Sequence, residues 1–142
     1  MKSVYIDCNI LIDWLLDREP FSTFSAKIIE LTETKKIKSY VSPLTLANTY
    51  CIIQKELNKR IADEFIKDSI SLFEILSITK ENVIYAINNK FKDFEDDLHT
   101  AIAEKNKLSY IVTRNKKDFE SSKIDIVDAE ELLRIIEDNK EN

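Results

Sequence analysis

Short apolar runs alternate with segments of helical periodicity along the chain. Lys2–Ile6 has the length and the Val, Tyr and Ile content of a β-strand, and Ile10, Leu11, Trp14 and Leu15 then recur at helical spacing. The same order of strand and helix repeats to the end of the sequence. The other predicted strands are Lys38–Ser42, Leu72–Ile78 with at least one buried face, Ser109–Thr113 and Ile124–Val127. The other predicted helices cover about 25–34, 43–57, 60–71, 80–89, a segment from Asp93 onward, and 128–137.

Strands that are separated by helices pair in parallel through right-handed crossovers. The chain has 142 residues, of which 44% are hydrophobic, so it suits one domain with a real core. We therefore predict an α/β fold with a mainly parallel sheet, a single domain over residues 1–142, and a tail that frays from about residue 138. The carboxyl ends of parallel strands lie on one edge of the sheet, where ligands of such sheets bind.

Asp7 stands where the first strand becomes the first helix. A carboxylate at the carboxyl end of a strand is placed to face a ligand. Asp7 or Asn9 is equally suited to cap the following helix, because both side chains accept hydrogen bonds from free backbone N–H groups. Taken alone, the position of Asp7 favours neither interpretation.

Composition restricts the chemistry. The chain contains no glycine, which excludes a glycine-rich phosphate loop or dinucleotide fingerprint. Its one histidine, His99, and its two cysteines lack the spacing of zinc ligands, and Cys8 and Cys51 lie in apolar sequence that indicates reduced, buried thiols. The net charge of −5 argues against a passive nucleic-acid-binding module. No secretory signal or membrane-spanning run is visible, so we expect a cytoplasmic protein without a membrane partner.

The densest acidic stretch is D-F-E-D-D, from Asp93 to Asp97. Apolar residues at Phe94, Leu98 and Ile102 predict that it opens an amphipathic helix. Asp93 is a natural N-cap, and carboxylates in a first helical turn gain about 0.3–1 kcal/mol each from the helix dipole. Capping explains two of the four acids, while four acids within five residues repel one another. We therefore favour a functional role, with Asp96 facing inward.

Two further places bring polar side chains to the same edge of the predicted sheet. The strand Ser109–Thr113 is followed at once by R-N-K-K-D-F, which places Asn115 and Asp118 in a loop at its carboxyl end. Asn48 lies on the helix 43–57, on a face that turns towards the strand ends. Each of these residues also has an ordinary explanation, as a turn residue or a polar helix residue. Their convergence with Asp7 is harder to explain in that way.

Three ordered motifs resemble the PIN domain family, and specifically its toxin-type, VapC-like ribonucleases. They are I-D-C-N-I-L-I-D at 6–13, D-F-E-D at 93–96 and T-R-N-K-K-D-F at 113–119. The resemblance implies a three-layer α/β/α sandwich around a sheet of about five strands. It also implies a ribonuclease that depends on Mg²⁺ or Mn²⁺, with RNA as substrate. An antitoxin protein and a second copy of the chain are candidate partners.

The resemblance assigns the family's residues as follows. The catalytic, metal-binding acids are Asp7, Asp96 and Asp118, and the supporting polar residues are Asn9, Thr113 and Asn115. Many members have a glutamate where this chain has Asn48, whose amide contributes no charge, and Asp93 or Glu95 is a candidate to compensate. Arg114, Lys116 and Lys117 are candidate phosphate contacts and equally candidate solvated loop charges. His99 is expected to be a polar helix residue rather than a base.

These residue types suit metal-assisted hydrolysis, because Mg²⁺ and Mn²⁺ prefer oxygen ligands and activate water for attack on phosphorus. Two other classes of function remain. One is a PIN-like module that binds RNA or protein without cleaving, which Asn48 and the acidic net charge support. The other is a domain phosphorylated on Asp7. Asn9 counts against a phosphatase of that kind, which usually has a second aspartate at this position.

Overall fold

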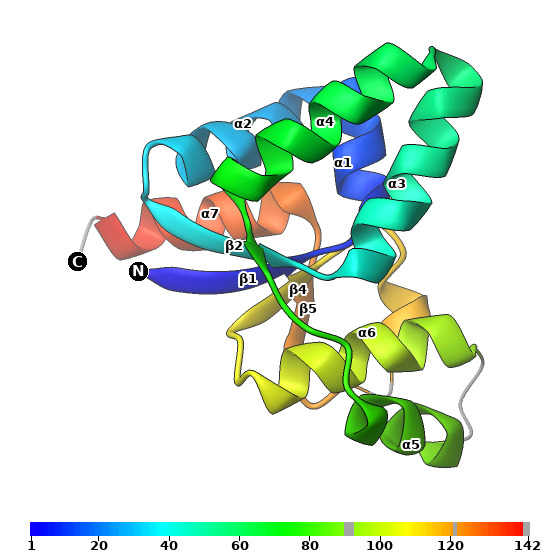
Figure 1. Ribbon diagram of the computed structural model, residues 1–142. Coiled ribbons are helices and arrows are strands. Elements are labelled where there is room, and N and C mark those ends of the chain that lie inside the picture. The colour runs from blue at the N-terminus through cyan, green and yellow to red at the C-terminus, as the bar shows by residue number, and fades with distance from the viewer. Residues whose placement is uncertain (90–92, 121, 141–142) are drawn as a thin grey trace.

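Five β-strands form the centre of the molecule in the computed structural model, which describes residues 1–89, 93–120 and 122–140. The strands are β1 (Lys2–Ile6), β2 (Ile37–Val41), β3 (Glu74–Ile75), β4 (Tyr110–Val112) and β5 (Asp125–Val127). All pairs are parallel, in the order β3-β2-β1-β4-β5 (Figure 1). The helices are α1 (Cys8–Leu15), α2 (Phe21–Glu33), α3 (Pro43–Glu56), α4 (Lys59–Leu72), α5 (Lys80–Asn89), α6 (Phe94–Lys105), the 3-10 turn η1 (Lys116–Phe119) and α7 (Ala129–Lys140).

Each face of the sheet has its own apolar core. Val4 and Ile6 of β1 pack with side chains of α1, α2 and α7, including Ile28. Successive strand residues point to opposite faces, so Tyr5 packs on the other side with Ile102 of α6. Figure 1 accordingly shows α5 and α6 on the side of the sheet away from α1 and α2. The predicted three-layer α/β/α fold around a five-stranded parallel sheet is confirmed.

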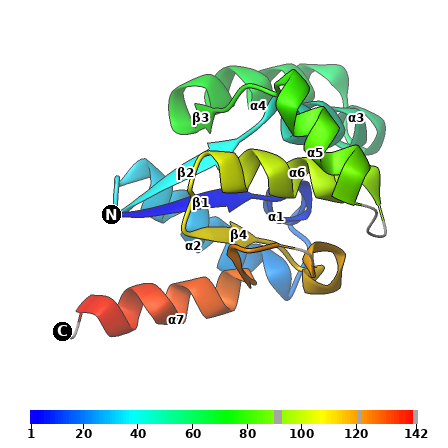
Figure 2. The same ribbon diagram turned by 90° about the horizontal axis from the view of Figure 1, so that it is seen from below.

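All strands run in one direction, so their amino ends lie on one side of the sheet and their carboxyl ends on the other. The N-terminus and the end of α7 lie on the same side of the molecule, where β1 and β2 begin (Figures 1 and 2). Asp7 follows the opposite end of β1, and the η1 turn with Asp118 follows the opposite end of β4. Residues 138–140 of the predicted frayed tail belong to α7, and residues 141–142 lie outside the described part of the chain.

The predicted strand 72–78 is much shorter in the structure, although the segment is partly buried: Phe73 lies in one core, and Leu76 and Ile78 pack against the other. Glu74–Ile75 form the whole of β3, and both residues are exposed. The reason is local: α4 continues through Leu72, and β3 pairs with β2 at the end of the sheet order, through Tyr40 and Val41. An edge strand of two residues carries little packing.

Two predicted buried positions on helices are also wrong. Cys51 is exposed, because α3 packs through other residues, including Ile53, which has no exposed surface. Phe94 is 45% exposed, so the buried side of α6 begins further along the helix and includes Leu98. Both cysteines are free. In the described part of the chain, no helix combines the length and apolarity needed to cross a membrane.

A buried ion pair ties α1 to the loop that follows β4. The Arg114 guanidinium donates two hydrogen bonds to Asp13, from Nε at 2.6 Å and from a terminal nitrogen at 3.1 Å. Asp13 has no exposed surface, and the guanidinium lies 4.4 Å from the centre of the Phe21 ring. A bidentate pair of this kind fixes direction as well as distance. It therefore sets the position of the loop relative to α1.

Asp13→Asn should lower the free energy of unfolding by about 1.5–3 kcal/mol, because it weakens hydrogen bonds to a charged partner. Urea unfolding of the purified protein measures this. Glu64→Gln, which breaks the exposed Arg60–Glu64 pair on α4, is the control and should cost less than about 0.5 kcal/mol. Equal losses in the two variants would contradict a structural role for the buried pair.

Candidate acidic metal site

Asp7 is held at the carboxyl edge of the sheet by donors from three residues. Thr113, which follows β4, donates from its hydroxyl to Asp7 Oδ2 at 2.7 Å. Asn9 Nδ2 donates to the same oxygen at 3.3 Å, and Cys8 N donates to Oδ1 at 2.8 Å. Asp7 is only 8% exposed. Asp7 therefore caps α1 with one oxygen, while the other faces Asn9 and Thr113.

The loop after β4 is built into this arrangement. Thr113 Oγ1 accepts hydrogen bonds from Asn9 Nδ2 at 3.2 Å and from Asn115 N at 3.0 Å. Asn9 Oδ1 accepts a further bond from Arg114 N at 3.3 Å. Asn9 and Thr113 thus both contact Asp7, whereas the side chain of Asn115 is exposed. Asp118 is exposed in η1, which follows this loop.

The pKa of Asp96 is affected by several neighbouring acids. Partial burial, followed by the negative charges of Asp118, Asp93, Asp7 and Glu95 in that order, raises the pKa of Asp96 from 3.8 to about 7. These charges come from the end of β1, the start of α6 and the η1 turn. The charges of Asp118 and Asp7 therefore act on Asp96, and the convergence of these three acids into one site stays a prediction.

The four acids of the D-F-E-D-D stretch have different surroundings. Asp93 Oδ1 accepts from Asp96 N at 3.1 Å, so Asp93 is the N-cap of α6, as predicted. Asp97 is buried and accepts from Asn89 Nδ2 of α5 at 3.4 Å. Glu95 accepts a short hydrogen bond from Asn48 Nδ2 of α3. Asp93, Glu95 and Asp96 thus contribute charge to the site, and Asp97 lies against α5.

His99 is buried, which the expectation of an ordinary polar helix residue missed. It is 1% exposed, and its Nδ1 lies 2.6 Å from the Tyr5 hydroxyl, which donates to Ser42 Oγ at 2.8 Å. Its Nε2 lies 3.9 Å from Glu95 Oε1, one helical turn earlier. Burial lowers the pKa of His99 and outweighs the opposing effect of the nearby acids. In the sequence, the position of His99 four residues after Glu95 was the available sign that the two side chains meet.

The donor set fits a hard divalent cation. Carboxylate oxygens are the ligands that Mg²⁺ and Mn²⁺ prefer, and the acids here repel one another until a cation neutralises them. As they lie, no three Asp, Glu, His or Cys side chains of the described residues form a group that could hold an ion. The kind of donor atom fits a divalent cation, while the described residues do not form a closed metal-holding group.

Two of the three candidate phosphate contacts already have carboxylate partners. Arg114 is paired with Asp13, and Lys116 Nζ bonds Glu131 of α7. Lys117 is exposed in η1.

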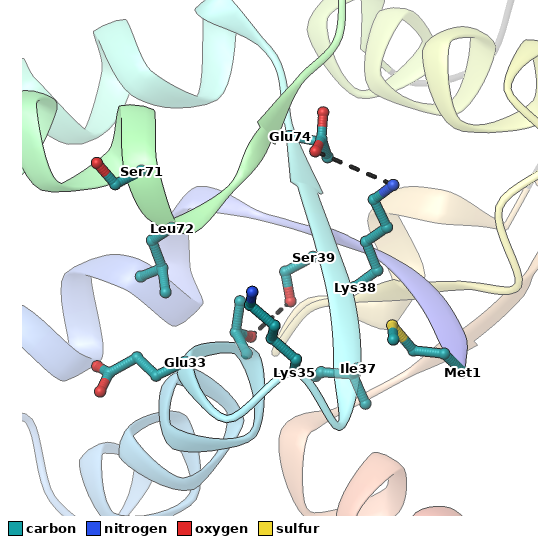
Figure 3. A pocket seen from close by; sticks show the side chains of 10 residues that line it. Met1, Glu33, Lys35, Ile37, Lys38, Ser39, Ser71, Leu72 and Glu74 are labelled. Carbon is teal, nitrogen blue, oxygen red and sulfur yellow. Dashed lines mark hydrogen bonds and ion pairs between the residues drawn. The ribbon is translucent and has the colours of Figure 1, made fainter.

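A hollow of about 450 Å³ lies at the opposite edge of the sheet (Figure 3). Its lining includes Lys35, Lys38, Leu72 and Glu74, and Lys38 pairs with Glu74 at 4.0 Å. Figure 3 shows these side chains around the first residues of β2. Asp7, Asp93, Glu95, Asp96 and Asp118 are absent from its lining.

The fold and this acidic edge define an α/β/α protein whose polar side chains gather where the strands end. A sequence model of the PIN domain matches residues 3–117. The chain belongs to the PIN domain family, a family that includes nucleases. A comparison with curated proteins found no match.

Solved structures share this fold at low sequence identity. The DNA-bound VapBC complex from Salmonella typhimurium is 19% identical with a TM-score of 0.69, covering 91% of this chain and 99% of that chain. A toxin–antitoxin complex from Klebsiella pneumoniae is 22% identical with a TM-score of 0.66, covering 89% and 97%. The sarcin–ricin loop cleaving toxin VapC20 from Mycobacterium tuberculosis is 13% identical with a TM-score of 0.61, covering 76% and 86%.

The raised pKa of Asp96 predicts a stability that depends on pH. Because its folded-state pKa of about 7 lies above the ordinary 3.8, folding favours the protonated form. The stability from this group is complete below about pH 4 and is lost as the pH rises through about 7. In chelator, Asp96→Asn should melt higher than the parent at about pH 8, and the difference should vanish towards about pH 4. Thermal melts across this range measure the effect.

Mn²⁺ should stabilise the Asp96→Asn protein less than it stabilises the parent, because binding to the folded state adds stability by mass action. Glu81→Gln is the control, since Glu81 lies in the first turn of α5. It should lower the melting temperature slightly and leave the response to Mn²⁺ unchanged. An Asp96→Asn protein that behaves like this control would reduce Asp96 to a helix-end charge.

Proposed function

We propose that this protein is a divalent-metal-dependent ribonuclease that hydrolyses RNA phosphodiester bonds in the cytoplasm. The observation that supports the proposal best is the field at Asp96, where carboxylates from three separate segments act on one another. A protein that keeps mutually repelling acids at the ligand-binding edge of a parallel sheet gains from a bound cation. Membership of the PIN domain family points to the same chemistry.

In this proposal Asp7, Asp96 and Asp118 hold Mg²⁺ or Mn²⁺. The bound ion supplies Lewis-acid chemistry for phosphodiester hydrolysis. Thr113 and Asn9 orient Asp7 through their hydrogen bonds to Oδ2. Because Arg114 and Lys116 are paired with carboxylates, we assign the phosphate contact to Lys117, which would position the strand without reading its sequence.

The chain is further proposed to be the toxin of a toxin–antitoxin pair. The structures that share its fold include a toxin–antitoxin complex from Klebsiella pneumoniae and a toxin that cleaves the sarcin–ricin loop. By this likeness we infer RNA as the substrate and an antitoxin protein as a partner. We also propose that the chain assembles with a second copy of itself as a homodimer.

Removal of a metal-binding acid should abolish most cleavage. Asp7→Asn and Asp96→Asn should each reduce Mg²⁺- or Mn²⁺-dependent cleavage of RNA at least about a hundredfold, because each weakens the site that activates the attacking water. A titration of cleavage against divalent metal measures this. Glu137→Gln is the control, because it also removes one negative charge. Glu137 lies on α7 near Lys36, at the amino ends of the strands, so this variant should cleave like the parent.

Cleavage by Asp96→Asn protein at the parental rate would remove Asp96 from the site. RNA binding by the parent without cleavage at any metal concentration would favour the alternative of a non-cleaving module. Besides Asn48 and the acidic net charge, that alternative is supported by the lack of a closed metal-holding group among the described residues.

His99 should affect stability more than chemistry. His99→Ala removes the partner of the buried Tyr5 hydroxyl, so it should lower the free energy of unfolding by about 1–3 kcal/mol. Cleavage by the folded protein should fall far less than in Asp7→Asn, because a buried imidazole with a lowered pKa is a poor general base. Urea unfolding and cleavage assays on one preparation separate the two effects. A hundredfold loss of cleavage at unchanged stability would make His99 catalytic.

A further inference from the structure

Two phenylalanine rings are exposed at the starts of helices. Phe21 is the first residue of α2 and is 41% exposed, and Phe94 is the first residue of α6 and is 45% exposed. Phe94 stands between Asp93 and Glu95 in the acidic stretch. The other phenylalanines of the described residues are half-buried or buried, and they are Phe24, Phe65, Phe73 and Phe119. Exposed rings of this kind therefore occur in the described chain only at these two helix starts.

Phe21 is tied to the loop that holds Asp7. The Arg114 guanidinium lies 4.4 Å from the centre of the Phe21 ring, and its two hydrogen bonds to the buried Asp13 keep it there. Thr113, the residue before Arg114, donates to Asp7 Oδ2. The cation covers only part of the ring, because Phe21 remains 41% exposed. The open part of the ring therefore has a fixed position relative to Asp7.

The two rings belong to helices on opposite faces of the sheet. The core beneath α2 contains Val4 and Ile28, and the core beneath α6 contains Tyr5 and Ile102. Figure 2 shows α2 and α6 on opposite sides of β1. Asp7 follows β1 directly. A linear ligand that crosses the carboxyl edge at Asp7 can therefore reach a ring on each side.

We propose that Phe21 and Phe94 are stacking platforms for unpaired bases of single-stranded RNA, one on each side of the acidic edge. This inference rests on the proposed function, which supplies RNA as the ligand. Aromatic side chains stack on unpaired bases of any sequence, because every base has a flat π-face. Bases within a duplex are stacked on one another and do not offer that face. The platforms therefore select a single strand without reading its sequence.

A protein partner would need a contiguous apolar surface. Phe21 and Phe94 do not form one, because the sheet separates their helices. The exposed apolar side chains that lie close together are instead aliphatic and belong to α5, where Ile84 and Ile87 are one turn apart. Separate rings on either side of a group of acids suit a ligand that stacks at separate points along a chain.

Binding of single-stranded RNA tests the platforms. All variants are made in the Asp7→Asn background, which should suppress cleavage while binding is measured. The probe is a labelled oligouridylate of about ten nucleotides, followed by fluorescence anisotropy in Mn²⁺. Phe21→Ala and Phe94→Ala should each weaken binding about tenfold, and Phe21→Trp should retain it, because a flat partner for the base is lost or kept. Ile70→Ala, which removes exposed apolar surface from α4, is the control and should bind like the background.

A probe without bases gives the sharpest result. An abasic strand of the same length keeps the backbone and its charge, while stacking becomes impossible. Phe21→Ala should cost nothing further with this probe, so the two changes are non-additive in a double-mutant cycle. Phe21→Leu keeps an apolar side chain without the flat face and should behave like Phe21→Ala. A ring that only supported the fold would weaken binding of both probes equally, and circular dichroism checks the fold of each variant.

The outcomes separate the inference from the proposed function. Background affinity in both alanine variants, or equal losses with the two probes, would overturn the stacking role and leave the proposed function standing. Unchanged RNA affinity together with loss of a dimer in sedimentation would make the rings protein contacts and would also overturn it. Tighter binding of a duplex than of the single strand would overturn the choice of single-stranded RNA. A parent that binds RNA through Phe21 and cleaves none at any metal concentration would overturn the proposed ribonuclease and support the inference.

Discussion

Repulsion among carboxylates is the constraint on which the acidic edge of this protein depends. Parallel pairing brings the end of β1 and the loop after β4 to one edge of the sheet, and α6 directs its N-terminal acids towards them. Burial raises the pKa of Asp96, and the like charges of neighbouring acids raise it further. The fold can keep such a cluster only if neighbouring groups offset the repulsion. Asp7 is stabilised in this way by Thr113, Asn9 and a backbone N–H group.

The residues after β4 contribute to this stabilisation. Thr113 donates to Asp7 while accepting from Asn9 and from the backbone of Asn115, so one hydroxyl joins two loops. Arg114 binds Asp13, which lies within α1, six residues after Asp7. The loop is thereby fixed to α1 at two points. An arginine this close to the site in sequence contributes to the position of the acids rather than to their neutralisation.

Periodicity was sufficient to predict the parallel fold, because strands that alternate with helices place their carboxyl ends together. The gathering of Asp7, Asp96 and Asp118 into one site stays a prediction. Periodicity could not predict that β3 is a two-residue edge, since the pairing partners available to a strand depend on sheet order. The burial of His99 depends on Tyr5, which is distant in sequence and belongs to another strand. The contact of Asn48 with Glu95 is likewise a property of how α3 and α6 pack. Pairings of this kind are fixed by tertiary packing, on which a local pattern carries no information.

The Asn48–Glu95 pair illustrates how an amide affects an acidic site. A carboxylate on α3 would add one more like charge beside Asp96, whose ionisation is already disfavoured. An amide adds no charge, and its N–H group offsets part of the repulsion felt by Glu95 through a charge-assisted hydrogen bond. The metal-free fold is therefore less strained electrostatically than it would be with an acid at both positions.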